Sequence, residues 1–217
     1  NKTICVSCSG NVAQYAVEKI NHLGGKAVSL SDSSGSIYDP DGIKGEKFDF
    51  LMDLKNNRRG RIKEYAEKFN VQYFEDQRPW SIKCDIAIPC ATQNEVNEID
   101  ASNLLGNGVF VISEGANMPS TRHAQNLFID AGILYGPAKA ANAGGVAVSG
   151  LEMAQASQRL YWTREEVDAK LKRIMSRIHT QCVDASNDFG CEGNYVDGAN
   201  IASFVKIAEA MAAQGIV

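Results

Sequence analysis

Residues 3–32 of the 217-residue chain have the sequence TICVSCSGNVAQYAVEKINHLGGKAVSLSD, and the order of patterns within them indicates the fold class. Its first five residues are β-prone, and after the turn CSGN apolar residues recur at steps of three and four as far as Leu23. A Gly-Gly pair ends this helical pattern, and a second β-prone run closes at Asp32. The stretch therefore predicts a strand, a tight turn, a helix and a second strand.

The rest of the chain continues this alternation. Short apolar runs predict further strands at residues 71–74, 86–89, 109–113 and 133–135. Apolar periodicity predicts helices at residues 48–56, 61–69, 163–182 and about 198–213, and turn chemistry predicts a loop or hairpin at residues 33–42. The expected fold is α/β: a Rossmann-like, doubly wound, mostly parallel sheet with long C-terminal helices.

We expect residues 1–150 to form a dinucleotide-binding domain, and residues 151–217 to form a helical segment that packs back on it within one structural unit. Because the chain starts with Asn1 and enters a strand almost at once, we expect it to be a piece of a longer protein.

Composition narrows the class of protein. The chain is 44% hydrophobic and 22% charged, and it contains neither a run of roughly 18 to 20 apolar residues nor a signal-peptide pattern, so we expect a soluble protein away from membranes. With 22 Lys and Arg against 26 Asp and Glu, the net charge of −4 argues against bulk nucleic-acid binding. Six cysteines without framework spacing predict a reducing, cytoplasmic environment.

The first turn has the form of a dinucleotide-binding loop. In doubly wound sheets, backbone N–H groups at the N-terminus of the first helix bind pyrophosphate. The usual pattern is GxGxxG or GxGxxA, and here Gly10 is the second glycine and Ala13 the third small residue, while Cys8 stands at the first position. Asp32 follows about twenty residues later, at the end of the second strand. A dinucleotide site is the sharper interpretation, and a glycine-containing turn without a ligand is the alternative.

Six motifs together extend this interpretation to a family. They are SGNVA at 9–13, SDSSG at 31–35, PCATQNE at 89–95, EGANMP at 114–119, KAANAGGV at 139–146 and SGLEM at 149–153. In this order the chain resembles the glutamate dehydrogenases of the hexameric Glu/Leu/Phe/Val dehydrogenase family, in register from about residue 2 to the C-terminus. The resemblance covers only that family's C-terminal dinucleotide-binding domain. The N-terminal substrate domain, which in the family supplies the catalytic lysine and aspartate, has no counterpart here.

The resemblance implies roles for individual residues. Residues at the first turn would contact the cofactor's pyrophosphate and ribose: Ser9, Gly10, Asn11 and Val12. Three more would line the adenosine and ribose: Ala91, Thr92 and Gln93. Asn117 and Asn142 would hold the nicotinamide ribose and carboxamide, and Val146 and Ser149 would contact the glutamate side chain, with the Ser149 hydroxyl on its distal carboxylate. Without the resemblance, Val146 and Ser149 are equally consistent with a helix packing on the sheet.

Charge near the second strand bears on which nicotinamide cofactor binds. Asp32 would accept the ribose hydroxyls of NAD and repel a 2′-phosphate. Five cations within nine residues stand against it: Lys55, Arg58, Arg59, Arg61 and Lys63. Alone, such a cluster is more often a solvated helix face. In the NADP-preferring members that the chain resembles, Ser33, Lys55 and Arg61 match residues around the 2′-phosphate, so we expect NADP, with NAD as the less favoured alternative.

Other site chemistries have weaker support. The Cys5-x-x-Cys8 pair invites a thioredoxin-like interpretation, but Cys5 lies inside the predicted strand rather than at a helix start. A zinc site from Cys5, Cys8, His179 and Cys182 would require distant elements to meet, so we expect no metal. The isolated histidines form no triad and no Walker A sequence occurs, which argues against hydrolase and P-loop classes.

By resemblance, the parent protein would catalyse reversible oxidative deamination of L-glutamate to 2-oxoglutarate and ammonia, with hydride passing to NADP, and would be a homohexamer. We expect no catalytic residue in this chain, because it offers no evident base or carbonyl-polarising lysine, so the chain alone should be inactive. The alternatives are a catalytically silent dinucleotide-binding module and a related Leu, Val or Phe dehydrogenase. Ser149 discriminates the latter, because a hydroxyl suits a carboxylate better than an aliphatic side chain.

Overall fold

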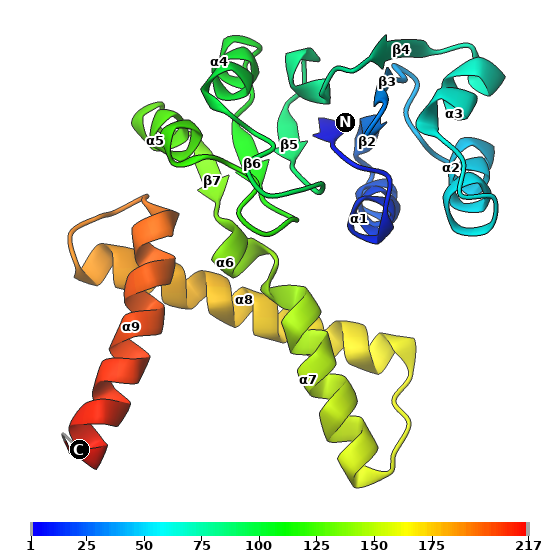
Figure 1. The fold of residues 1–217 in the computed structure, drawn as a ribbon. Helices are drawn as coiled ribbons and strands as arrows, with labels where there is room; N and C mark the ends of the chain where they lie inside the picture. The colour runs from blue at the N-terminus through cyan, green and yellow to red at the C-terminus, as the bar shows by residue number, and fades with distance from the viewer. Residues whose placement is uncertain (1, 216–217) are drawn as a thin grey trace. The chain divides into compact units, whose positions relative to one another are not determined.

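The computed structural model describes residues 2–215 (Figure 1). The chain divides into two compact units, one ending at Leu134 and the other beginning at Tyr135. The first unit carries the sheet and the second is helical. How the C-terminal segment packs on the sheet domain, with the expected boundary near residue 150, stays a prediction.

The first unit alternates strands and helices. In chain order its elements are β1 (Thr3–Val6), α1 (Asn11–His22), β2 (Lys26–Asp32), β3 (Gly35–Tyr38), α2 (Glu46–Met52), a π-helical turn (Asp53–Asn57), α3 (Ile62–Phe69), β4 (Gln72–Glu75), a 3₁₀ turn (Pro79–Ser81), β5 (Ile86–Ile88), α4 (Glu98–Gly106), β6 (Val111–Ser113) and α5 (Arg122–Asp130). β7 (Leu134–Gly136) begins at the unit's last residue. The predicted strands and the first three predicted helices all appear within a few residues of their expected bounds.

Over the described residues 2–215, the sheet has seven strands in the order β4-β3-β2-β1-β5-β6-β7. β1 pairs in parallel with both β2 and β5, and β5 pairs in parallel with β6. β3 runs antiparallel to β2 and to β4, so residues 33–42 contribute a hairpin strand rather than a plain loop. The expected α/β class with a mostly parallel sheet is confirmed. Because the chain leaves β1 in the middle of the sheet, the turn after β1 lies where the strand order reverses.

Burial explains why the first stretch adopts this form. Cys5 and Val6 of β1 are fully buried, as expected for a central parallel strand covered on both faces. On α1, Ala13, Val17 and Ile20 are buried and share one face through their spacing of four and three residues. Complete burial of a valine or isoleucine side chain stabilises a fold by roughly 1.5–3 kcal/mol.

The two glycines after α1 are needed for different reasons: Gly24 for its backbone conformation, and Gly25 because a side chain would not fit there. Gly24 has a φ of 78°, the left-handed conformation that ends many helices at low cost only in glycine. The Gly25 N–H donates to the carbonyl of Ile20 at 2.9 Å, and a Cβ at Gly25 would lie 2.9 Å from Cδ1 of Ile4. The pair therefore lets the chain turn closely over β1 and enter β2.

The described part of the second unit, after the end of β7, contains four helices: α6 (Ala138–Ala141), α7 (Ala143–Gln158), α8 (Arg164–Asp188) and α9 (Tyr195–Gln214). α8 begins with the predicted capping box, in which Thr163 Oγ1 accepts the Glu166 N–H and Glu166 accepts the Thr163 N–H at 2.7 Å. α9 begins three residues before its expected start, because the Asn194 side chain accepts the N–H groups of Val196 and Asp197.

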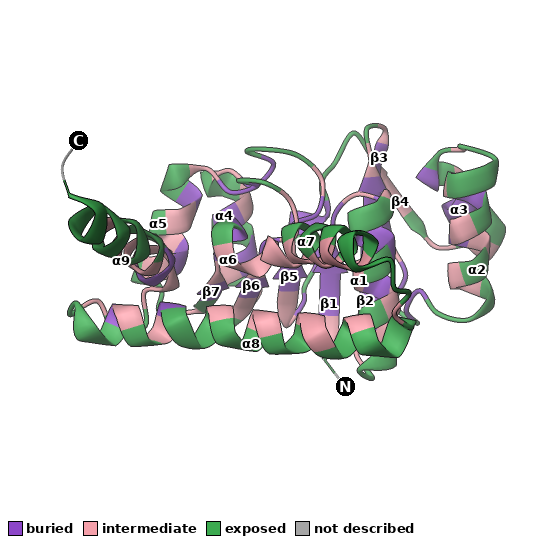
Figure 2. Ribbon diagram, turned by 90° about the horizontal axis from the view of Figure 1, so that it is seen from below, coloured by how far each residue is buried: buried purple, intermediate pink, exposed green. Residues whose placement is uncertain are grey.

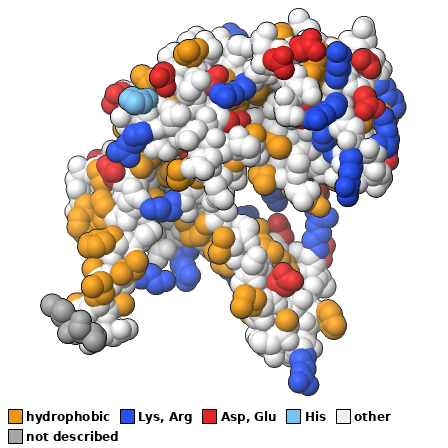
Figure 3. All heavy atoms as spheres, in the orientation of Figure 1, with side chains coloured by type: hydrophobic (Ala, Val, Ile, Leu, Met, Phe, Trp, Pro, Cys, Tyr) orange, Lys and Arg blue, Asp and Glu red, His pale blue; other side chains and the backbone are white. Residues whose placement is uncertain are grey.

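These four helices bury little of their own surface. In α7, among the described residues, none is buried, and α8 buries only Cys182 and Ser186 (Figure 2). Hydrophobic side chains gather on the exposed surface of α9, namely Phe204, Ile207 and Met211 (Figure 3). No helix within residues 2–215 is both long and apolar enough to cross a membrane.

Candidate functional site

Hydrogen bonds join the loop after β1 to the end of β2, and the loop after β5 to the loop after β6, at one edge of the sheet. The Cys8 N–H donates to Ser31 Oγ at 2.8 Å, and the Ser31 N–H donates to the Cys8 carbonyl at 3.0 Å. The Gly115 N–H donates to the Pro89 carbonyl at 2.9 Å, which links the loops after β5 and β6. Because carboxyl ends of parallel strands meet at one edge, residues distant in sequence are assembled around the start of α1.

The first turn has the backbone conformation expected for its glycine pattern. Cys8 has a φ of 70°, which lies in the left-handed region. This conformation costs a residue with a Cβ roughly 1–2 kcal/mol. The Cys8 Sγ accepts the Gly10 N–H at 3.3 Å. The first position of the glycine pattern therefore keeps its left-handed geometry with a cysteine in place.

The N-terminus of α1 is open. Gly10 is its N-cap residue and makes no side-chain hydrogen bond to the first turn of the helix. Asn11 is exposed, and Val12 is 50% exposed, whereas Ser9 is buried and its carbonyl accepts the side-chain N–H of Gln14 at 2.8 Å. Backbone N–H groups at such an end attract anions through their own partial charge and the helix dipole. Gly10, Asn11 and Val12 thus form a surface that fits a phosphate group.

Asp32 has structural hydrogen bonds at the end of β2. One carboxylate oxygen accepts the Ser34 N–H at 2.9 Å, and the other accepts the Ile62 N–H at 2.8 Å. The Lys55 Nζ lies 3.8 Å from the second oxygen. Asp32 therefore holds the N-terminus of α3 against β2, and its negative charge is offset by a lysine and by that helix end.

Lys55 and Arg61 face the end of β2. The Arg61 guanidinium donates to Ser33 Oγ at 2.6 Å, and the Lys55 ammonium donates to the Gly60 carbonyl at 2.9 Å. The π-helical turn Asp53–Asn57 carries Lys55, and such turns often occur at functional sites. Ser33, Lys55 and Arg61 therefore lie near Asp32 at the end of β2.

The other cations of the cluster have different partners. Arg58 pairs with Glu64, and Lys63 lies 3.9 Å from a carboxylate oxygen of Glu75. Cationic side chains cover the α2–α3 side of the first unit (Figure 3). Only part of the cluster thus faces β2.

A buried carboxylate that no sequence pattern marks fixes the loop after β5. Glu95 is 5% exposed, and its Oε1 accepts the Ser7 hydroxyl at 2.9 Å and the Ala91 N–H at 2.8 Å. Ser7 Oγ in turn accepts the Cys90 N–H at 2.8 Å. Loss of solvation raises the pKa of Glu95 to about 7. The loop that presents the exposed Thr92 and Gln93 is thereby tied to the end of β1.

The remaining predicted residues lie in two places. Asn117 is exposed in the loop after β6, beside Met118, whose φ is 45°. Asn142, Val146 and Ser149 belong to the second unit: Asn142 precedes α7, Val146 is 79% exposed, and Ser149 is exposed three residues further along. Residues three apart share a helix face, so Val146 and Ser149 offer one neighbouring apolar and hydroxyl surface.

The cysteines do not match the thioredoxin-like or zinc interpretations. The Cys5 thiol donates to the Ile82 carbonyl at 3.8 Å and interacts with the Cys84 thiol, so Cys84 rather than Cys8 is its neighbour. Within residues 2–215, no group of three or more His, Cys, Asp or Glu side chains is placed to hold a metal ion. The His179 ring packs at 5.7 Å from the Tyr195 ring.

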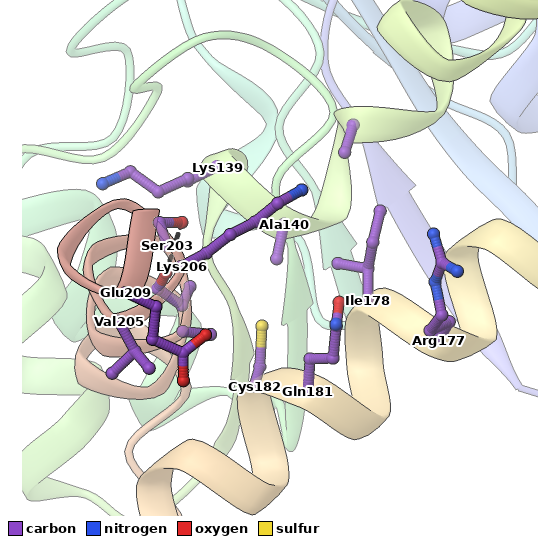
Figure 4. Close-up of a pocket in the computed structure, with 13 residues that line it drawn as sticks. Lys139, Ala140, Arg177, Ile178, Gln181, Cys182, Ser203, Val205, Lys206 and Glu209 are labelled. Carbon is purple, nitrogen blue, oxygen red and sulfur yellow. Dashed lines mark hydrogen bonds between the residues drawn. The ribbon is translucent and has the colours of Figure 1, made fainter. Parts of the chain in front are cut away.

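The second unit contains a pocket of 640 Å³ that none of the predicted site residues lines. Its lining comes from α6, α7, α8 and α9, and includes Lys139, Arg177, Cys182 and Lys206 (Figure 4). The lining also contains the acidic Glu209 and the polar Gln181 and Ser203, so it presents both charges beside its apolar residues.

Comparison with known proteins agrees with this geometry. Residues 1–215 match the family model of the Glutamate/Leucine/Phenylalanine/Valine dehydrogenases. The chain is 61% identical to the NAD(P)-specific glutamate dehydrogenase of Xylanibacter ruminicola and 59% identical to the NADP-specific glutamate dehydrogenase of Haemophilus influenzae, over 99% of this chain and 48% of each relative. The chain therefore spans about half the length of these relatives.

A solved structure shows the same fold. The glutamate dehydrogenase of Plasmodium falciparum superimposes with a TM-score of 0.96 at 49% identity, over 100% of this chain and 47% of that protein. The family model covers nearly the whole chain. The chain belongs to the Glutamate/Leucine/Phenylalanine/Valine dehydrogenase family.

Proposed function

We propose that this chain is the cofactor-binding half of an NADP-dependent glutamate dehydrogenase. The whole enzyme would transfer hydride between L-glutamate and NADP, in reversible oxidative deamination to 2-oxoglutarate and ammonia. The observation that carries the proposal is the convergence of Ser33, Lys55 and Arg61 at the end of β2, in the same unit as the open N-terminus of α1.

These two features suit the two phosphate groups of NADP. The first turn of α1 presents N–H groups to a pyrophosphate. A 2′-phosphate at the end of β2 would meet one hydroxyl and two cations, and charge-assisted hydrogen bonds of this kind contribute about 1.5–3 kcal/mol each. The Asp32 carboxylate, which would otherwise repel that phosphate, already accepts two backbone N–H groups and lies near Lys55.

The names of the relatives support NADP without excluding NAD. One of the two similar proteins is called NADP-specific and the other NAD(P)-specific. We therefore propose NADP as the preferred cofactor, with NAD as a weaker ligand.

Each residue would contribute binding and orientation. The cofactor supplies the hydride chemistry when bound, and the protein positions it. Asn117 and Asn142 would orient the nicotinamide end, and Ser149 would donate its hydroxyl to the distal carboxylate of glutamate, beside the apolar side chain of Val146.

The other half of the enzyme would supply the catalytic groups. We propose that this chain alone is inactive, that the exposed faces of α7 and α9 contact the substrate half, and that the full-length enzyme is a cytoplasmic homohexamer. Val146 and Phe204, 79% and 68% exposed, are surfaces that such a contact would bury.

A paired fluorescence titration of this chain with NADPH and NADH at moderate salt tests the proposal. Saturable binding that favours NADPH would support both the turn and the cationic pocket. Equal affinity would contradict the 2′-phosphate assignment, and binding of neither would contradict the cofactor site. Incubation with glutamate and NADP should give no turnover, and activity above background would contradict the division of labour between the halves.

Ser149 is the feature that favours glutamate over the family's aliphatic substrates. In the full-length enzyme, Ser149→Ala should lower kcat/KM for glutamate more than for leucine or valine. An equal loss for all three would favour a Leu, Val or Phe dehydrogenase. If the chain binds NADPH but the full-length protein shows no dehydrogenase activity, the result would favour the alternative that the chain is a catalytically silent dinucleotide-binding module.

A further inference from the structure

Two cysteines follow neighbouring strands at the same level of the sheet. β1 and β5 pair in parallel with Val6 opposite Ile88, and Cys8 and Cys90 each come two residues later. The strands stay side by side past their last paired residues, because the Ser7 N–H donates to the Ile88 carbonyl and the Cys90 N–H donates to Ser7 Oγ. Neighbouring strands lie about 4.8 Å apart, which falls within the Cα separation that a disulfide bridges.

The surroundings of Cys90 place its sulfur near the first turn. A Cβ at Gly115 would lie 2.8 Å from the Cys90 Sγ and 3.2 Å from Cγ1 of Val12, so the Cys90 thiol lies close to the start of α1. Burial raises the pKa of the Cys90 thiol, and the charges of Glu95 and Cys8 raise it further. Cys8 is therefore near enough to act on Cys90 electrostatically.

The two thiols differ in access to solvent. Cys8 is partly exposed at the rim of the turn, whereas Cys90 is 3% exposed beneath it. This is the arrangement of a thiol that an oxidant reaches first and a second thiol that resolves the product.

We propose that Cys8 and Cys90 form a reversible disulfide when a peroxide oxidises Cys8, and that this bond closes the N-terminus of α1 to dinucleotide. The closing of the dinucleotide site rests on the proposed function, whereas formation of the disulfide does not. No role in hydride transfer is involved, so the pair is a modification site additional to the cofactor site.

The chemistry balances in two steps. The Cys8 sulfur attacks one oxygen of hydrogen peroxide and breaks the O–O bond, so Cys8 becomes a sulfenic acid and one water leaves. The Cys90 sulfur then attacks the Cys8 sulfur, the S–O bond breaks, and the departing hydroxide takes the Cys90 proton as a second water. Two thiols are oxidised by two electrons, and one peroxide is reduced to two waters.

The disulfide changes the turn that would bind pyrophosphate. In the reduced chain the Cys8 sulfur accepts the Gly10 N–H, and the bond to Cys90 would turn this sulfur towards β5. The backbone of Cys8 is already in the left-handed conformation and has little freedom to adjust. Movement of the Cys8 sulfur would therefore also displace the backbone of Gly10. We expect affinity for NADPH to fall at least tenfold on oxidation and to return with dithiothreitol.

Peptide mapping tests the bond without reference to the cofactor. The chain is treated with hydrogen peroxide, its free thiols are blocked with N-ethylmaleimide, and it is cleaved before aspartate. This cleavage is needed because trypsin leaves Cys84 and Cys90 in one peptide, whereas cleavage before Asp85 separates residues 76–84 from residues 85–99. The proposal requires residues 1–31 to be linked to residues 85–99.

Two results would overturn the bond. A link from residues 1–31 to residues 76–84 would show that Cys84 rather than Cys90 is the partner, and the absence of any link at full oxidation of Cys8 would show that Cys90 does not resolve it. Cys8→Ala and Cys90→Ala should each abolish the link, while Cys191→Ala, which removes a partly exposed cysteine of the second unit, should leave it.

An NADPH titration of the reduced and oxidised chain tests the consequence. Weaker binding after oxidation, restored by dithiothreitol and absent in Cys90→Ala, is the expected result. A mapped disulfide with unchanged NADPH affinity would overturn the closing of the site. If the reduced chain binds no NADPH at all, the proposed cofactor function fails, and the mapping still decides whether the disulfide forms.

Discussion

Ile62 donates its backbone N–H to Oδ2 of Asp32 at 2.8 Å, across thirty residues of sequence. Ile62 is the first residue of α3 and Asp32 the last of β2, so this hydrogen bond attaches a helix end to the central sheet. An acidic residue at this position is commonly associated with ribose recognition. Here the carboxylate has a structural partner at each oxygen, which makes Asp32 first of all a support for the segment that carries Lys55 and Arg61.

Asp32→Ala should therefore destabilise the chain itself. Loss of a capping carboxylate costs about 0.5–2 kcal/mol, and we expect a loss in this range in the free energy of unfolding, measured by urea denaturation without cofactor. Asp41→Ala is the matched control, because the Asp41 side chain is 88% exposed and should matter little. If Asp32→Ala unfolds at the same urea concentration as the parent chain, Asp32 does not have this supporting role.

Replacing Lys55 and Arg61 by glutamine should reduce the preference for NADPH over NADH. Each cation would lose a charge-assisted hydrogen bond to the 2′-phosphate, so we expect NADPH affinity to fall at least tenfold while NADH affinity changes little. Fluorescence titration with both cofactors measures the ratio. Arg58→Gln with Lys63→Gln removes the same charge from the cluster at residues that pair with Glu64 and Glu75, and the ratio should then persist. An unchanged ratio in the Lys55 and Arg61 variant would refute the pocket.

Cys8→Gly should be more stable than Cys8→Ala. Both variants remove the thiol, but alanine retains the cost of a left-handed conformation at φ 70° and glycine does not. We expect the free energies of unfolding to differ by about 1 kcal/mol in favour of glycine. Comparing the two variants in one denaturation experiment isolates the backbone from the sulfur, and the reverse order would mean that the turn relaxes away from this conformation.

Glu95 should make stability depend on pH in one direction. Its pKa is raised from 4.5 to about 7 in the folded chain, so between these values the folded state keeps a proton that the unfolded state has released. The stabilising contribution of this group is complete below pH 4.5, falls as pH rises, and is gone above about 7. At about 1.4 kcal/mol per pK unit the fall amounts to at most about 3 kcal/mol.

Glu95→Gln removes the proton exchange while keeping an oxygen for the Ser7 hydroxyl and the Ala91 N–H. The free energy of unfolding of this variant, measured by urea denaturation from pH 5 to 8, should lose that fall. Glu98→Gln, a change at an exposed glutamate of α4, serves as the control. A parent chain and a Glu95→Gln variant with parallel pH profiles would show that Glu95 titrates normally.

The sequence predicts the parts of this fold that depend on local patterns. The apolar runs of β1 and β5 and the periodic face of α1 follow from residue type and spacing alone, and the glycine turn follows from their order. The start of α9 differs from the predicted start because Asn194 caps the helix. Asn is also common in loops, so its presence alone does not identify a helix start.

The supporting contacts of the site could not be predicted in the same way. The bond from Ile62 to Asp32 and the contact between Ser7 and Glu95 join residues that lie 30 and 88 positions apart. No periodicity reports such pairs, because they depend on how strands and loops are arranged in space. The burial of Glu95 likewise leaves no mark on the sequence beyond a glutamate that follows a strand.

The cations proposed to select the cofactor occupy a short segment between two buried residues. Leu54 and Ile62 are both fully buried, and the seven residues between them include Lys55 and Arg61 and bury no side chain. The core fixes the two ends of this segment, while Lys55 and Arg61 inside it make polar contacts with Asp32, Gly60 and Ser33. Substitution of Lys55 and Arg61 would then change the proposed cofactor preference while the buried residues of the sheet and the turn after β1 remain as they are.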